Sequence, residues 1–82
     1  MSRDELKKLV DEGHEIEFNY NGKKYSISYG ELNGKEVISF CEFYKETTEV
    51  KTAEELWNNV SRDGVTVGEM LTAIGEDQIY IY

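Results

Sequence analysis

Residues 15–29 read EIEFNYNGKKYSISY, and two alternating polar and apolar runs in them flank an Asn-Gly pair. Asn21-Gly22 is typical of a two-residue hairpin turn, because both turn positions need a positive φ that Asn and Gly tolerate. Such a turn places Phe18 opposite Tyr25 and Ile16 opposite Ile27, so the apolar side chains of both strands share one face. The other face then carries polar side chains, those of Glu15, Glu17, Asn19, Lys24, Ser26 and Ser28.

A second Asn-Gly pair, Asn33-Gly34, predicts a third strand over residues 36–44. If this turn also has two residues, Tyr29 faces Ile38 and the apolar face continues across three strands. The third strand also carries apolar groups on its other side, and these are Val37, Cys41 and Phe43. We therefore expect an inner strand, or one whose second face is partly covered. A longer turn would exchange the two sets of side chains between the faces.

Two further segments are expected to join this sheet. Residues 49–51 can form a short fourth strand. Residues 78–82 read QIYIY, a β-prone sequence that we expect to dock on an edge of the sheet.

Three helices are predicted from capping boxes, in which a Ser or Thr and a Glu three residues later satisfy free N–H groups. Residues 2–5, 52–55 and 66–69 read SRDE, TAEE and TVGE, and apolar residues follow each at helical spacing. Gly13 and Gly75 are expected to end the first and third helices. The predicted order is α-β-β-β-(β)-α-α-β, a single α+β domain over residues 1–82. It is an antiparallel β-meander of three to five strands with about three short helices packed on one face.

The composition limits the classes of function. The chain has 82 residues, with 17 Asp and Glu against 9 Lys and Arg, and a formal net charge of −8. This charge disfavours sequence-independent binding of nucleic acid and docking to an anionic membrane. No apolar run is long enough for a membrane span, and the charged start MSRDE does not resemble a signal peptide. With a single cysteine, Cys41, we expect a cytoplasmic protein.

Candidate catalytic groups are few. The one His and the one Cys, His14 and Cys41, are predicted to lie on opposite faces of the sheet, which argues against a Cys-His nucleophile pair. The acidic residues match neither zinc nor calcium ligand spacing, and the glycines form no phosphate-binding loop. We therefore predict no enzymatic activity, no cofactor and no metal site.

Two surface features are candidates for binding a protein partner. The first is a set of acidic residues on the open face of the sheet, its turns and its edges, namely Glu15, Glu17, Glu31, Glu36, Glu46 and Glu49. Such carboxylates could imitate a row of phosphates, or they could be ordinary surface charge. The second is the aromatic excess, in which Phe43, Tyr44, Tyr80 and Tyr82 need not all fit in the core.

Three segments carry a resemblance to known sequences. They are IEFNYNGKKY (16–25), FCEFYKE (40–46) and TAEELWNNV (52–60). They resemble small uncharacterised acidic proteins of Firmicutes and of their phages and mobile elements. The resemblance implies no catalytic or binding residue. It does imply an accessory protein or inhibitor of a mobile element, a group that includes anti-CRISPR proteins.

The sequence thus predicts a non-enzymatic, acidic protein-binding module. In its most concrete form it is an inhibitor that occupies a basic nucleic-acid-binding groove of a protein partner, using the six glutamates, without binding nucleic acid itself. The alternative is a structural or regulatory interaction protein that forms a homodimer, or docks on another protein, through Tyr80, Tyr82 and the edge of the sheet.

Overall fold

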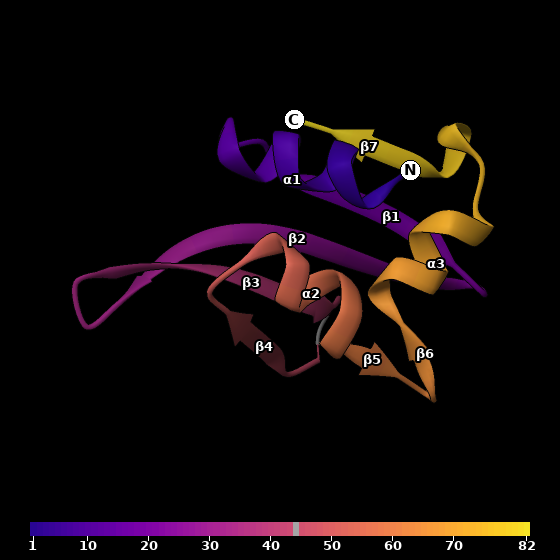
Figure 1. Ribbon diagram of the computed structural model, residues 1–82. Helices are drawn as coiled ribbons and strands as arrows, with labels where there is room; N and C mark the ends of the chain where they lie inside the picture. Colours follow the sequence, from indigo (N-terminus) through magenta and orange to yellow (C-terminus); the bar gives the residue numbers. More distant parts are fainter. Residues whose placement is uncertain (44) are drawn as a thin grey trace.

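Five strands form one antiparallel sheet in the order β4-β3-β2-β1-β7 (Figure 1). The computed structural model describes residues 1–43 and 45–82, so Tyr44, one of the candidate contact aromatics, lies outside the described residues. The elements are α1 (Arg3–Asp11), β1 (Ile16–Tyr20), β2 (Lys23–Leu32), β3 (Lys35–Glu42), β4 (Thr47–Val50), α2 (Ala53–Asn59), β5 (Ser61–Arg62), β6 (Val65–Thr66), α3 (Val67–Ala73), the 3-10 helix η1 (Glu76–Gln78) and β7 (Ile79–Ile81). This α+β arrangement, with three helices and an antiparallel sheet, confirms the predicted fold class.

Both Asn-Gly turns have the predicted geometry. Asn21 and Gly22 have φ angles of 50° and 78°, and Asn33 and Gly34 have 54° and 78°. These turns set Ile16 opposite Ile27 and Tyr29 opposite Ile38, so one apolar face runs across β1, β2 and β3. The β2–β3 hairpin continues past the helices and projects from the rest of the chain (Figure 1).

The two predicted additional strands occupy the two edges of the sheet. β4 pairs with β3 and spans 47–50, slightly earlier than the expected 49–51, so β3 is an inner strand. β7 pairs with β1 at the other edge, with Tyr80 opposite Glu17. The edge position predicted for the QIYIY segment is therefore confirmed.

All three helix starts are capped as predicted. The side chains of Ser2, Thr52 and Thr66 accept hydrogen bonds from the backbone N–H three residues later, at 3.1–3.2 Å. Gly13 adopts a φ of +79° just after α1, as expected of a residue that ends a helix. Gly75 also follows the C-cap of its helix, Ile74, as predicted, but it has an ordinary φ of −79° and begins η1 instead of forming a left-handed cap.

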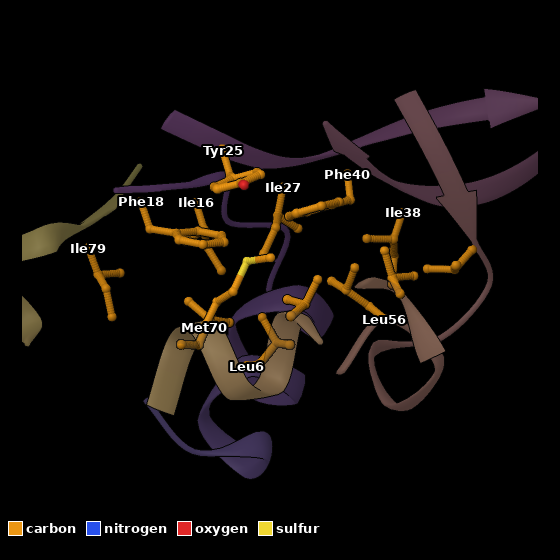
Figure 2. Packing of buried hydrophobic residues seen from close by; sticks show 14 residues of the cluster. Leu6, Ile16, Phe18, Tyr25, Ile27, Ile38, Phe40, Leu56, Met70 and Ile79 are labelled. Atoms are coloured by element: carbon orange, nitrogen blue, oxygen red, sulfur yellow. The ribbon is translucent and has the colours of Figure 1, made fainter. Parts of the chain in front are cut away.

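The core lies between the apolar face of the sheet and the three helices (Figure 2). Phe18, Tyr25 and Phe40 stack on the sheet side, with ring centroids 5.3 to 6.2 Å apart. From the opposite side, Leu6 of α1 and Leu56 of α2 point toward them, together with Met70 of α3. Each of these three is fully buried. Because the three helices pack on this side, the other side of the sheet has no second layer among the residues that the structure describes.

The sequence prediction missed one small element. β5 and β6 form a hairpin around Asp63-Gly64, whose φ angles are 54° and 80°. The Lys23 ammonium lies 2.8 Å from the Asp63 carboxylate, so this turn is joined to the β1–β2 turn. Beside it, the Arg62 guanidinium lies 5.0 Å from the centre of the Phe40 ring and closes one end of the core.

Candidate protein-binding face

The side of the sheet opposite the helices presents two parallel rows of side chains, which we call the open face. Strand pairing places one residue of each strand in the first row, and the second row continues the same alternation through Glu15, just before β1, and Tyr82, just after β7. The second row is extended to the last residue by the Tyr82 N–H, which donates to the Glu15 main-chain oxygen at 2.8 Å. The first row is Tyr80, Glu17, Ser26, Cys41 and Thr47, and the second is Tyr82, Glu15, Ser28, Ser39 and Glu49.

The middle of the open face is flat, because its side chains are small. Ser26, Ser28, Ser39 and Cys41 occupy the two central strands and are all half-buried. The Ser26 hydroxyl lies 3.2 Å from the sulfur of Cys41, the residue opposite it on β3.

Three of the six predicted glutamates meet on the open face. Glu15 and Glu17 are two residues apart on one strand, so their side chains leave the sheet about 6.6 Å from each other. Glu49 lies three strands away, about 14 Å across the sheet. The two rows contain no Lys or Arg, and none of these three carboxylates has an ion-pair partner among the described residues. These two rows are therefore acidic, and the cation Lys24 lies beside them on the same side of the sheet, opposite Asn19.

Tyr80 and Tyr82, two of the predicted contact aromatics, lie at the β7 margin of the open face. Tyr80 is 46% exposed and Tyr82 is 65% exposed. The neighbouring Glu17 carboxylate raises the pKa of the Tyr82 hydroxyl, because it favours the protonated form. Beside them is a shallow recess of about 160 Å³, which Lys24 also lines. Two glutamates and two exposed tyrosines are thus brought together over β1 and β7.

The other three predicted glutamates lie elsewhere. Glu31 and Glu36 face each other across the exposed end of the β2–β3 hairpin, on the side of the sheet that also carries the core. Like charges directly opposite each other destabilise a strand pair. Glu46 is exposed and lies between β3 and β4. The structure therefore divides the predicted set into a group of three on the open face and three separate residues.

The two candidate catalytic side chains have separate partners. Cys41 contacts Ser26 on the open face. The His14 ring lies 2.9 Å from the main-chain oxygen of Tyr82 through Nδ1, and 3.4 Å from the Glu12 carboxylate through Nε2. The Tyr29 hydroxyl donates to the His14 carbonyl at 2.7 Å. In residues 1–43 and 45–82, no group of three or more His, Cys, Asp or Glu is placed to hold a metal ion.

Sequence reasoning missed two surface features. One is a hollow of about 570 Å³ between α1, the β2–β3 hairpin and the start of α2, which Arg3, Lys7 and Lys51 line together with several carboxylates. Its lining comes from separate segments, so no local motif could have indicated it. The other is Ile81, which is 46% exposed on the outermost strand. The alternation of QIYIY carried that signal, because it places Ile81 on the opposite side from the tyrosines.

Comparisons of the chain with protein-family models, with curated proteins and with solved structures found no match. Within the described parts of the chain, no helix has both the length and the apolar character needed to cross a membrane.

Proposed function

We propose that this chain is a non-enzymatic binding module whose open face docks on the basic surface of a protein partner. The observation that carries the proposal is the combination, on one uncovered sheet face, of Glu15, Glu17 and Glu49 with the exposed Tyr80 and Tyr82. Carboxylates supply charge complementarity, and exposed tyrosines are common anchors in protein interfaces.

The spacing of the carboxylates indicates what such a partner must offer. At physiological ionic strength, interactions between exposed charges are screened beyond about 8 Å. Glu15 and Glu17 are closer than this and act on one cluster of cations, whereas Glu49 is farther away and needs a second cation. A groove that binds a nucleic-acid backbone has cations distributed in this way, because it must neutralise successive phosphates.

The most concrete form of the proposal is an inhibitor that fills such a groove and so excludes nucleic acid. The net charge of −8 supports it, since a chain with this charge is attracted to a strongly basic protein before contact. The resemblance to small acidic proteins of phages and mobile elements points in the same direction, because inhibitors of host defence proteins occur among them.

The first experiment is an affinity pull-down from a nuclease-treated Gram-positive lysate, eluted in rising salt, with the bound proteins identified by mass spectrometry. The partner is then tested against the triple variant Glu15→Lys, Glu17→Lys, Glu49→Lys. The matched control is Glu31→Lys, Glu36→Lys, Glu46→Lys, which changes the net charge equally but leaves the open face intact.

We expect the open-face variant to bind at least about tenfold more weakly than the control, with the far-UV circular dichroism of both unchanged. An equal loss of binding affinity in the two triple variants would mean that net charge, and not the open face, drives the association. Full binding by the open-face variant would refute the proposal outright.

A second candidate function is self-association or docking through the β7 edge. It is favoured by the exposure of Tyr80, Ile81 and Tyr82 on one short strand. This association would be insensitive to salt, and Tyr80→Asp or Tyr82→Asp would disrupt it. Sedimentation velocity over a wide range of concentration tests it, and a monomer throughout would exclude the homodimer.

A further inference from the structure

The outer edge of β7 offers main-chain hydrogen-bonding groups that no described residue uses. β7 is the last strand of the sheet and pairs with β1 on one side only (Figure 1). In an antiparallel pair, successive residues direct their N–H and C=O groups alternately toward and away from the partner strand. The bond from the Tyr82 N–H to Glu15 shows that Tyr80 and Tyr82 are directed toward β1.

Ile79 and Ile81 are consequently directed outward. The Ile79 N–H is already donated to the Glu76 carbonyl at the end of η1. The Ile79 C=O and both main-chain groups of Ile81 remain, and none of them has a backbone partner in the described parts of the chain. These three groups are arranged to pair with an added strand.

The side chains of this edge do not protect it from pairing. Edge strands in natural proteins are commonly blocked by Lys, Pro, bulges or inward-pointing charges. The segment 78–82 contains no charged residue and no Pro. By contrast, the β4 edge carries Glu49 and is contacted by Arg62, which donates to the Thr48 hydroxyl at 2.7 Å.

We infer that the β7 edge binds an extended segment of the partner by strand addition, and that this segment alternates basic and apolar residues. The inference rests on the proposed function, because it takes the partner to be basic. Basic side chains of the added strand would lie on the open-face side, over the Tyr80 and Tyr82 rings. The backbone of that strand would be about 9.6 Å from β1, two strand spacings away, and a long Lys or Arg side chain directed toward Glu17 brings its charge within the screening length of about 8 Å. Apolar side chains would lie on the other side, against the exposed Ile81.

Charge selects this occupant over a second copy of the chain. Two copies would each bring a net charge of −8, and the edge of the second copy supplies no Lys or Arg to Glu15 and Glu17. A cationic strand neutralises these carboxylates and uses the same backbone groups.

The test uses the full chain and three fluorescent peptides of seven residues, with binding measured by anisotropy. The first alternates Lys and Val, the second contains the same residues with all Lys before all Val, and the third alternates Glu and Val. We expect the alternating Lys-Val peptide to bind at least about tenfold more tightly than either of the others.

The decisive variant is Ile81→Pro, which removes the outward N–H but leaves the Tyr82 bond to β1 in place. Pro is tolerated at an edge strand when its N side faces solvent. We expect Ile81→Pro to reduce the affinity for the alternating Lys-Val peptide about tenfold or more. Ile81→Thr keeps the N–H, so its affinity for the peptide should fall only a few-fold. In the wild-type chain, hydrogen exchange of the Ile81 amide should slow when the peptide is added, which tests the pairing without any substitution.

The failures of the two proposals are distinguishable. Equal binding of the alternating and block peptides, an unchanged Ile81 amide, or full binding by a folded Ile81→Pro variant would overturn strand addition and leave the open-face proposal intact. A homodimer that dissociates in Ile81→Pro would also overturn the inference, because the occupant would be a second copy. If the peptide behaves as expected while the open-face lysine variant retains its partner, the proposed function fails alone.

Discussion

The contact between Gly68 and Trp57 allows a stability prediction with a defined magnitude. Gly68 is buried near the start of α3, and the Trp57 indole of α2 lies over it. A Cβ added to Gly68 would lie 2.5 Å from Trp57 Nε1 and 2.7 to 2.8 Å from two ring carbons. Ordinary contacts between heavy atoms need about 3.5 to 4.0 Å, so Gly68→Ala requires the indole to move by about 1 Å.

Two opposing effects decide the outcome. Overpacking of this kind costs about 1–3 kcal/mol, and Ala is favoured over Gly inside a helix by at most about 1 kcal/mol. The gain from Ala is smaller in the first turn, where Gly68 lies, because the helix there is only partly hydrogen-bonded. We expect Gly68→Ala to lower the free energy of unfolding by about 1–2 kcal/mol.

Urea unfolding followed by circular dichroism measures this free energy, and Trp57 is the only Trp, so its fluorescence reports the displacement directly. Gly30→Ala is the matched control, since its nearest atom would be the Ser39 hydroxyl at 4.0 Å and its φ is not positive. In a Trp57→Leu background, Gly68→Ala should be neutral or stabilising. Stabilisation of the wild-type chain by Gly68→Ala, with the Trp57 emission unchanged, would refute the packing argument.

Three further outcomes are expected. Thr52→Ala should cost about 1 kcal/mol of unfolding free energy in urea, because it removes a helix cap, whereas Thr52→Ser should cost little. Burial raises the pKa of the Tyr29 hydroxyl, so the folded chain retains that proton longer than the unfolded chain does. Stability should therefore fall as the pH rises through the ordinary tyrosine range near about 10, and urea midpoints should show a smaller fall in Tyr29→Phe. Glu17→Gln should lower the pKa of the Tyr82 hydroxyl toward its ordinary value in an NMR titration, and Glu49→Gln should leave it unchanged.

The parts of the fold that could be predicted from the sequence are those set by local chemistry. Asn21-Gly22 and Asn33-Gly34 impose their turns through backbone φ angles, and each turn then fixes the register of whole strands. The caps at Ser2, Thr52 and Thr66 likewise depend on a hydrogen bond within three residues. No distant contact has to be known for either feature.

The errors occur where the outcome depends on distant contacts or where a local signal was passed over. Asp63-Gly64 is a hairpin signal of the same kind as Asn-Gly, and it marks the β5–β6 hairpin that was missed. Gly75 follows the C-cap of α3 as expected, but it lacks a left-handed φ, and the chain continues from it into η1 and then β7, which pairs with β1. That route depends on the position of the sheet edge, which no residue near Gly75 encodes.

The grouping of the candidate binding residues was predictable only in part, for the same reason. Hairpin register alone places Glu15 and Glu17 on the open face. Their proximity to Tyr80 and Tyr82 requires β7 to pair with β1, a contact between segments about sixty residues apart in the chain. Prediction could propose that the tyrosines lie at an edge, but not which edge.

The choice of edge is what joins the two proposals. Had β7 paired with β4, the tyrosines would lie beside Thr47 and Glu49, and β1 would form the free edge with Glu15 and Glu17 directed onto it. Charged residues at an edge oppose strand addition. With β7 outside β1, the carboxylates lie one strand in, where they can attract a cationic segment without blocking the edge to which it pairs. The Tyr82–Glu17 contact links the charged strand to the pairing strand, so substitution of Glu17 should affect both the salt-dependent attraction and the peptide bound at the edge.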